Sequence, residues 1–215
     1  MNTLTLDEIR LRIDGQELFP PLSVRIEPGT VTSVVGASGS GKSSLLKFLC
    51  GILPPEIEGS GAVRLNDNEI STLPPQARRL GLLFQDPLLF PHLDVAGNVL
   101  FGLRTRGTRR ERQQQVSEAL TSVGLAGLGT RDPATLSGGQ QARVALLRVL
   151  LAEPRALLLD EPFRSLDEDH RVKVRELVFT EARRRGLPTL LVTHDESDVV
   201  AAAGPVIRLQ DSRHA

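Results

Sequence analysis

Eight consecutive residues have the types and spacing of a loop that binds phosphate groups. Residues 36–43 read Gly-Ala-Ser-Gly-Ser-Gly-Lys-Ser, which matches the pattern G-x-x-x-x-G-K-[ST]. Glycines let such a loop curl so that its N–H groups face a β-phosphate. Lys42 would reach the β- and γ-phosphates, and the Ser43 hydroxyl would take one coordination position on Mg²⁺. We therefore predict a nucleotide site formed by Gly36, Ala37, Ser38, Gly39, Ser40, Gly41, Lys42, Ser43 and Ser44.

The residues on both sides of this loop fit that prediction. The motif needs a strand before it and a helix after it. The run Val31–Val35 is largely β-branched, and Leu45, Leu46 and Leu49 have helical spacing that ends at Gly51. A Gly/Ser turn that contains a lysine by chance is the alternative, and this context makes it much the weaker interpretation.

Composition limits the classes of function. The 215 residues are 40% apolar, enough for one substantial core with a small subdomain. The net charge is zero, so no long-range field attracts nucleic acid or an anionic membrane. Aromatic residues make up 3%, without Trp or Tyr, which argues against base stacking and hence against nucleic acid as a partner. The single cysteine, Cys50, excludes an internal disulfide.

No segment of the sequence looks like a signal peptide or a membrane helix. No apolar run approaches the ~20 residues that a membrane helix needs. We therefore expect a cytoplasmic chain that works at a membrane only by docking onto an embedded partner.

Predicted strands and helices alternate, which favours an α/β fold. The first strands should form a small antiparallel layer, and the later ones a mainly parallel sheet. Residues 86–152 have little strand signal and are predicted to form an inserted helical subdomain. We expect strands at Leu4–Ile13, Leu22–Ile26, Val31–Val35, Ala62–Leu65, Leu80–Phe84, Ala156–Leu159 and Thr189–Thr193, and helices at Glu111–Val123, Ala142–Leu151 and Glu168–Arg185.

A basic cluster lies in the region of the helical subdomain. Its members are Arg104, Arg106, Arg109, Arg110 and Arg112. A solvated face is the favoured interpretation of such a run, ahead of a docking patch for an acidic partner or for lipid head groups.

Polar residues follow several predicted strands, where ligands of parallel sheets bind. Asp160 is the expected second holder of Mg²⁺, opposite Ser43. Glu161 is the expected catalytic residue, since a carboxylate beside a γ-phosphate can orient or deprotonate water. His194 could hydrogen-bond the γ-phosphate, and Gln85 could position water or the metal. Each of these residues alone is weak evidence, since a Gln at a strand end is usually a surface residue and a lone His is usually a hydrogen-bonded bystander.

A second candidate anion site precedes the helix at Ala142–Leu151. Ser137 is a good helix N-cap, and the two glycines after it leave the backbone open. One chain cannot comfortably use both sites on one nucleotide. We therefore expect a head-to-tail pair in which Leu136, Ser137, Gly138, Gly139 and Gln140 of one copy close the phosphate loop of the other.

Taken together, these motifs resemble the ATP-binding subunit of an ABC transporter along nearly the whole chain. The ordered motifs are the phosphate loop, Gln85, the signature Leu136–Gln140, the run Leu157–Pro162, the turn Ser165-Leu166-Asp167 and His194. The stretch Leu88–Asn98 is similar to importer subunits for small solutes, where it lies near the cleft that receives the permease. The resemblance implies a P-loop NTPase core, ATP and Mg²⁺ as cofactors, a dimer contact at Ser165, Leu166 and Asp167, and a place on the inner face of the cell membrane.

The sequence departs from that family in three places. Ile13 stands where relatives usually stack an aromatic residue on adenine, so we expect aliphatic packing and weaker base selectivity. Arg164 stands where Ser is more frequent. The chain ends at Ala215, so we expect one ABC domain over 1–215 without a C-terminal regulatory domain.

Our leading hypothesis is an ATPase that energises import through a membrane permease, served indirectly by a solute-binding protein. An exporter subunit or a soluble ABC-type ATPase is the alternative, although the soluble types need a coiled coil or basic surfaces that are missing here. A P-loop kinase would leave Leu136–Gln140 unexplained. The transported solute and the direction of transport do not follow from these residues.

Overall fold

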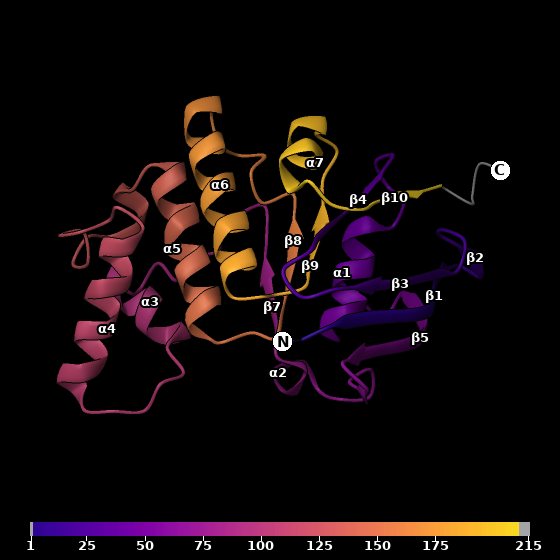
Figure 1. Ribbon diagram of the computed structural model, residues 1–215, viewed down its shortest axis with the longest axis horizontal. Coiled ribbons are helices and arrows are strands. Elements are labelled where there is room, and N and C mark those ends of the chain that lie inside the picture. Colours follow the sequence, from indigo (N-terminus) through magenta and orange to yellow (C-terminus); the bar gives the residue numbers. More distant parts are fainter. Residues whose placement is uncertain (1, 211–215) are drawn as a thin grey trace. The chain divides into compact units, whose positions relative to one another are not determined.

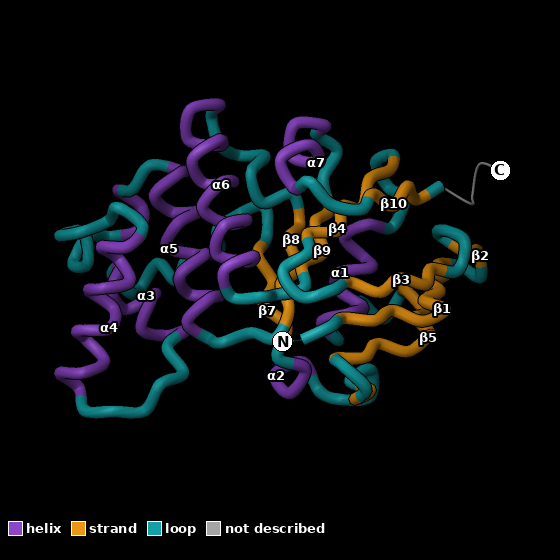
Figure 2. The backbone as a smooth tube through the Cα atoms, viewed as in Figure 1, coloured by secondary structure: helices purple, strands orange, loops and turns teal. Residues whose placement is uncertain are grey.

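The computed structural model describes residues 2–210 (Figures 1 and 2). The chain divides into two compact units. The first consists of Met1–Leu82, Arg155–Glu161 and Phe179–Ala215, and the second of Leu83–Pro154 and Pro162–Val178.

The first unit contains two sheets. The antiparallel sheet has the order β2-β1-β5-β6, with β3 paired to β1. The parallel strands are ordered β10-β4-β9-β8-β7, so that β4 lies between β10 and β9. This arrangement confirms the predicted α/β class with an antiparallel layer. The strands are β1 (Leu4–Ile13), β2 (Gln16–Glu17), β3 (Leu22–Ile26), β4 (Val31–Gly36), β5 (Ile57–Leu65), β6 (Asn68–Glu69), β7 (Leu80–Leu83), β8 (Ala156–Asp160), β9 (Thr189–Val192) and β10 (Val206–Leu209).

One apolar core joins the two sheets of this unit to helix α1 (Lys42–Cys50). Leu6 from the antiparallel layer, Leu46 from α1 and Leu158 from the parallel sheet are all buried in it. The two shorter helices of the unit are α2 (Pro75–Arg78) and α7 (Glu196–Ala202). Because α1 packs in this core, the end of the phosphate loop that joins α1 is held in place.

Arg78 holds the C-terminal end of α1 in place. Its buried guanidinium donates hydrogen bonds to the carbonyl oxygens of Phe48 (2.9 Å) and Leu49 (2.7 Å), and its Nε donates to Leu73 O (2.9 Å). A cation at a helix C-terminus satisfies carbonyls that have no partner inside the helix. Gly51 has φ 74°, and a Cβ there would lie 2.8 Å from the Arg78 guanidinium, so this close approach requires glycine.

The second unit is helical, as Figure 1 shows, with α3 (Val95–Gly102), α4 (Arg109–Ser122), the short 3₁₀ helix η1 (Pro133–Thr135) and α5 (Gly138–Leu151). Helix α6 (Glu168–Arg184) begins in this unit. Val99 of α3, Leu120 of α4 and Leu147 of α5 belong to a common core. The segment that follows Gln85 and the segment that precedes Ser137 are both attached to helices that pack in this core.

Local patterns missed several elements. Strand β5 begins at Ile57, before the predicted strand Ala62–Leu65, and runs through Gly59-Ser60-Gly61 because it pairs with β1 over nearly its full length. Gly61 lies opposite a bulge in β1 at Glu8, where a Cβ would come within 2.6 Å of the Glu8 carbonyl oxygen. Pairing with a neighbouring strand therefore outweighs the low strand propensity of glycine. Helices α3 and α7 and strand β10 also had no counterpart among the expected elements.

The buried position of Cys50 makes a testable prediction. Its side chain is 8% exposed at the end of α1, and burial raises the pKa of its thiol to about 12. Only about one molecule in 10⁴ then carries the reactive thiolate near pH 8. We expect iodoacetamide to modify the native chain at least ~100-fold more slowly than the urea-unfolded chain, followed by mass spectrometry. Equal rates would contradict this packing, and no second thiol interferes.

Candidate nucleotide site

The phosphate loop connects β4 to α1 within the first unit. Gly39 and Gly41 have φ values of 81° and 86°, the left-handed region that favours glycine. A Cβ on Gly41 would also lie 3.1 Å from Leu18 and Phe19. Gly41 is the N-cap of α1, and no side chain in residues 2–210 caps this helix end. The strand, the left-handed glycines and the uncapped helix produce the geometry that the motif predicts for an anion site.

Lys42 lies folded back over the loop. Its Nζ donates to the carbonyl oxygens of Gly36 (2.8 Å) and Ala37 (2.6 Å), and it is 3.5 Å from Ser40 Oγ. The side chain is only 7% exposed. Burial lowers the pKa of Lys42, while the nearby charges of Glu161 and Asp160 raise it. The ammonium group is thus held at the loop by carbonyls that a phosphate could replace.

Two of the three predicted metal ligands lie together. Ser43 Oγ donates a hydrogen bond of 2.9 Å to Asp160 Oδ1. The pKa of Asp160 is raised, mainly by burial, although the hydrogen bond from Ser43 opposes the shift. A hydroxyl and a carboxylate are the hard oxygen donors that Mg²⁺ prefers, so this pair fits the ion. Gln85, the third predicted ligand, belongs to the second unit, and its part in metal binding stays a prediction.

Glu161 follows β8 directly and contacts His194, which follows β9. The distance from His194 Nδ1 to Glu161 Oε2 is 3.1 Å. Glu161 has φ 44°, an unusual conformation for a residue with a side chain, and its N–H donates to Val192 O (2.9 Å). Its side chain is 18% exposed and that of His194 is 55% exposed. The strained backbone turns the carboxylate toward the histidine at the same sheet edge as Asp160.

A buried network that the sequence analysis missed holds the turn around His194. Thr193 Oγ1 donates to Asp198 Oδ2 (3.0 Å) and accepts from the N–H of Asp195 (3.1 Å). Thr193 and Asp198 are each 2% exposed. The clue available in the sequence was Asp195, a helix N-cap that places Asp198 in the first turn of α7. These hydrogen bonds hold the backbone turn that carries His194.

The signature residues begin α5 in the second unit. The N–H of Gln140 donates to Ser137 Oγ (3.3 Å), and the N–H of Ser137 donates to Gln140 Oε1 (3.0 Å), which forms a capping box. A Cβ on Gly139 would lie 2.7 Å from His170 Cδ2, so this position needs glycine. Leu136 is 6% exposed and packs in the core of the unit. Ser137, Gly138 and Gln140 remain as the residues available to a second chain.

The turn Ser165-Leu166-Asp167 lies in the same unit. Ser165 Oγ donates to the carbonyl oxygen of Gln85 (3.3 Å). Asp167 accepts from the N–H of His170 (3.1 Å), and His170 Nδ1 lies 2.8 Å from its carboxylate, which lowers the pKa of Asp167. The structure thereby links the predicted dimer turn to the backbone at Gln85.

Two further residues that sequence reasoning missed fix the segment after Gln85. The Arg148 guanidinium of α5 donates to Leu88 O (2.8 Å) and Pro87 O (3.0 Å) and lies 5.1 Å from the centre of the Phe90 ring. The buried Asn98 side chain accepts from the N–H of Phe90 (2.7 Å) and donates to Phe90 O (3.1 Å). Leu88 has φ 44°, a left-handed backbone conformation that is unusual for leucine. The hydrogen bonds from Arg148 and Asn98 therefore hold a specific turn in this segment.

Ile13 lies at the end of β1, half-buried against the core of the first unit. Asp14 and Gly15, both with positive φ, turn the chain tightly from β1 into β2. An aliphatic contact with a base at Ile13 stays a prediction.

Comparison with known proteins shows the family of this chain. Residues 19–164 match the protein family described as ABC transporter. The uncharacterized ABC transporter ATP-binding protein YnjD of Escherichia coli (strain K12) is 42% identical over 92% of this chain and 91% of its own length.

Two iron-import proteins are similarly related. The Fe(3+) ions import ATP-binding protein FbpC 1 of Rhizobium meliloti (strain 1021) is 41% identical over 92% of this chain. FbpC of Streptomyces coelicolor is 42% identical over 99% of this chain. The chain spans only 55% and 60% of the lengths of these two relatives.

A solved structure shares the fold at 28% identity, with a TM-score of 0.80 over 97% of this chain and 95% of the other. It is described as a dimeric post-hydrolysis state of the ATP-binding cassette MJ0796 bound to ADP and Pi.

Proposed function

Because this chain belongs to the ABC transporter family and is an ATP-hydrolysing domain of it, we propose that it powers import of a small solute through a membrane permease. The observation that carries the proposal is the meeting of the phosphate loop, Asp160 and the Glu161–His194 pair within one unit. The names of the iron-import relatives favour import over the alternative of an exporter or a soluble system.

The proposed chemistry assigns a role to each group. Lys42 and the loop N–H groups bind the β- and γ-phosphates, and Ser44 contacts the nucleotide at the start of α1. Ser43, Asp160 and Gln85 would hold Mg²⁺, which would supply positive charge to neutralise the phosphates. Glu161 orients and deprotonates the attacking water, and His194 both holds Glu161 and hydrogen-bonds the γ-phosphate. Thr193 and Asp198 keep His194 at the required place.

A second copy of the chain completes the site in this proposal. Ser137, Gly138 and Gln140 at the start of α5 would face the γ-phosphate of the partner copy, because a helix N-terminus attracts anions. The turn at Ser165 would lie at the dimer contact. Its hydrogen bond to Gln85 O would couple that contact to the segment around Gln85. The dimeric relative MJ0796 supports this arrangement. ATP would therefore join two copies, and the copies would separate after hydrolysis, once the products leave.

The second unit offers a surface for the permease. A cavity of about 480 Å³ is lined by α3, α4 and the 127–130 segment, including Asp94, Leu100, Val116 and Leu120. Leu88 (57% exposed) is an apolar side chain of the same unit. No helix among residues 2–210 has the length and apolar character to cross a bilayer. We assign the chain to the inner face of the cell membrane, attached through the permease and served indirectly by a solute-binding protein.

Uptake into proteoliposomes tests the import assignment directly. The chain would be co-purified with a candidate permease, reconstituted with MgATP inside, and supplied with radioactive Fe³⁺ outside. Accumulation that needs ATP and is lost with Lys42→Ala would support import, whereas ATP-dependent efflux would establish the exporter alternative. The same assay with other solutes addresses which one is carried.

Base selectivity is expected to be low. An aliphatic Ile13 holds adenine less specifically than an aromatic ring would. We expect GTP to support turnover within about tenfold of ATP, a difference of ~1.4 kcal/mol. Phosphate release at saturating and limiting nucleotide measures this, and Ile13→Tyr should shift the preference toward ATP. A much larger preference in the native chain would mean that another contact reads the base.

A further inference from the structure

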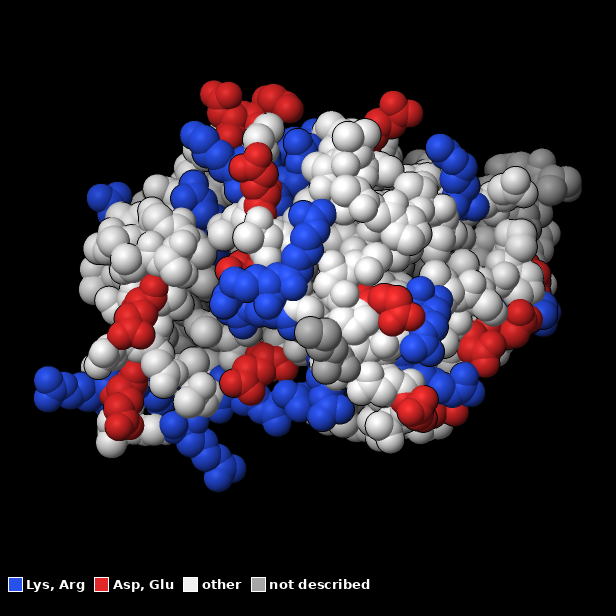
Figure 3. Space-filling model, viewed as in Figure 1, with Lys and Arg blue, Asp and Glu red and all other residues white. Residues whose placement is uncertain are grey.

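Four arginines around the connection between α3 and α4 face solvent without an acidic partner. Arg104 and Arg106 lie in the connection, and Arg109 and Arg110 form the start of α4. All four are exposed, and none of them forms an ion pair within residues 2–210. Figure 3 shows basic side chains projecting around this connection at the lower left. We call these four residues the arginine cluster.

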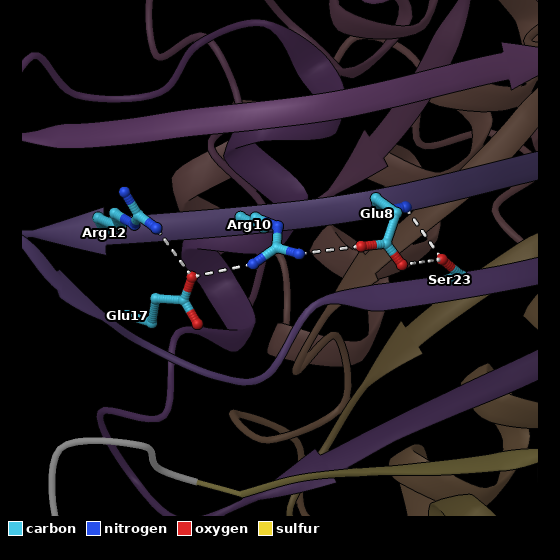
Figure 4. Close-up of polar contacts among 5 residues, drawn as sticks. All are labelled: Glu8, Arg10, Arg12, Glu17 and Ser23. Atoms are coloured by element: carbon cyan, nitrogen blue, oxygen red, sulfur yellow. Dashed lines mark hydrogen bonds and ion pairs between the residues drawn. The ribbon is translucent and has the colours of Figure 1, made fainter.

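Arginines on the antiparallel sheet, by contrast, are paired with acids. On the antiparallel sheet, Glu17 binds both Arg10 (3.3 Å) and Arg12 (3.1 Å), and Arg10 also binds Glu8 (3.1 Å), as Figure 4 shows. Arg25 pairs with Glu27 at 2.7 Å and Arg64 with Asp7 at 3.0 Å. The chain as a whole is neutral. The four arginines of the cluster differ from these sheet arginines in having no acidic partner within residues 2–210.

Helix stability does not explain the cluster. Cations at a helix N-terminus oppose the helix dipole, and acidic residues are favoured there. The only acid in the first turn of α4 is Glu111. Its carboxylate is already bonded to the N–H (2.7 Å) and hydroxyl (3.0 Å) of Thr108 in a capping box. Arg109 and Arg110 thus occupy positions that disfavour them, next to an acid that is engaged elsewhere.

An exposed aromatic residue adjoins the cluster. Phe101 is in the last turn of α3, three residues before Arg104, and is 69% exposed. One edge of its ring contacts Phe90, with the ring centres 4.7 Å apart. Arginines beside an exposed apolar ring are typical of surfaces that lie against lipid head groups.

We propose that the arginine cluster and Phe101 bind the anionic lipid surface beside the permease. The proposal rests on the membrane placement in the proposed function. Zero net charge removes long-range attraction, but basic clusters act within a Debye length of an anionic membrane. An acidic protein segment is less favoured, because none of the four arginines lines the 480 Å³ cavity of this unit. Nucleic acid is less favoured because single strands need several stacking aromatics.

Vesicle co-sedimentation tests this proposal with the full chain. We expect binding to phosphatidylcholine vesicles that contain about 30% phosphatidylglycerol, little binding to pure phosphatidylcholine, and loss of binding at about 300 mM salt. Replacing Arg104, Arg106, Arg109 and Arg110 together with Gln should weaken binding by at least about tenfold. Phe101→Ser should weaken it by a smaller factor.

A matched variant controls for net charge. Replacing the paired arginines Arg10, Arg12, Arg25 and Arg64 with Gln removes the same charge and should leave vesicle binding unchanged. Equal loss in both variants, equal binding to neutral vesicles, or no binding by the native chain would overturn the proposal. Tighter binding to polyglutamate or to single-stranded DNA than to anionic vesicles would also overturn it.

Measuring the ATPase rate in solution distinguishes a failure of lipid binding from a failure of the proposed function. Cluster variants that hydrolyse ATP normally without vesicles, but no longer bind them, support lipid binding. A native chain that binds anionic vesicles without hydrolysing ATP would leave lipid binding intact and contradict the proposed function. Thermal unfolding of each variant confirms that it is folded.

Discussion

Replacing Glu161 with Gln is expected to slow ATP hydrolysis by about 10²–10⁴-fold while ATP still binds. The amide cannot accept the proton of the attacking water, yet it has nearly the size of the carboxylate. Lys42, Ser43 and Asp160, which carry the phosphate and metal contacts, are unchanged. Phosphate release measures the rate, and a fluorescent ATP analogue measures binding.

The matched control is Glu168→Gln, which removes an exposed acid from the first turn of α6. We expect it to hydrolyse ATP at the native rate. Because bound ATP would persist in the Glu161→Gln chain, gel filtration with MgATP should show a dimer. Turnover within a fewfold of the native rate would remove Glu161 from the role of general base, and a monomer would count against the shared site.

Mixing two inactive variants is expected to restore activity if the site is shared between two copies. Lys42→Ala removes the phosphate contact, and Ser137→Arg blocks the start of α5. A mixed dimer of the two contains one site with both Lys42 and Ser137 intact. Random pairing makes half of the dimers mixed, so about a quarter of the native rate should return, if the two sites act independently.

The control for this experiment is a chain that carries both changes. Mixed with Lys42→Ala, it cannot regenerate an intact site, and no activity should return. The chains are combined before nucleotide is added, and phosphate release is followed across mixing ratios. A rate that stays at the level of the separate variants at every ratio would argue that each chain uses its own residues.

The parts of the site that are contiguous in sequence could be predicted. The fixed spacing from Gly36 to Ser43 already contains the turn, the lysine and the helix start. The strand before Asp160 has so few residues between two prolines that only its end could carry the acids. Local rules suffice where neighbours in the chain are also neighbours in the site.

Other parts depend on residues far apart in sequence. Arg148 lies in the predicted helix Ala142–Leu151, but its carbonyl partners lie 60 and 61 residues earlier in the sequence. Asp198 is a buried carboxylate whose partner, Thr193, is identified only once α7 is in place. The contact between Glu161 and His194 needs both the strand order and the left-handed backbone at Glu161. Such contacts follow from tertiary packing, which no local pattern contains.

Helix α5 carries Ser137 at its start and Arg148 three turns later. Eleven residues of α-helix span about 16 Å, and a helix of this length transmits displacement as a rod. Since Arg148 is bonded to the backbone of Pro87 and Leu88, a displacement of Ser137 would be passed along α5 to exposed Leu88. The stroke delivered to a permease would then equal the displacement received at Ser137, and its timing would follow the lifetime of bound ATP.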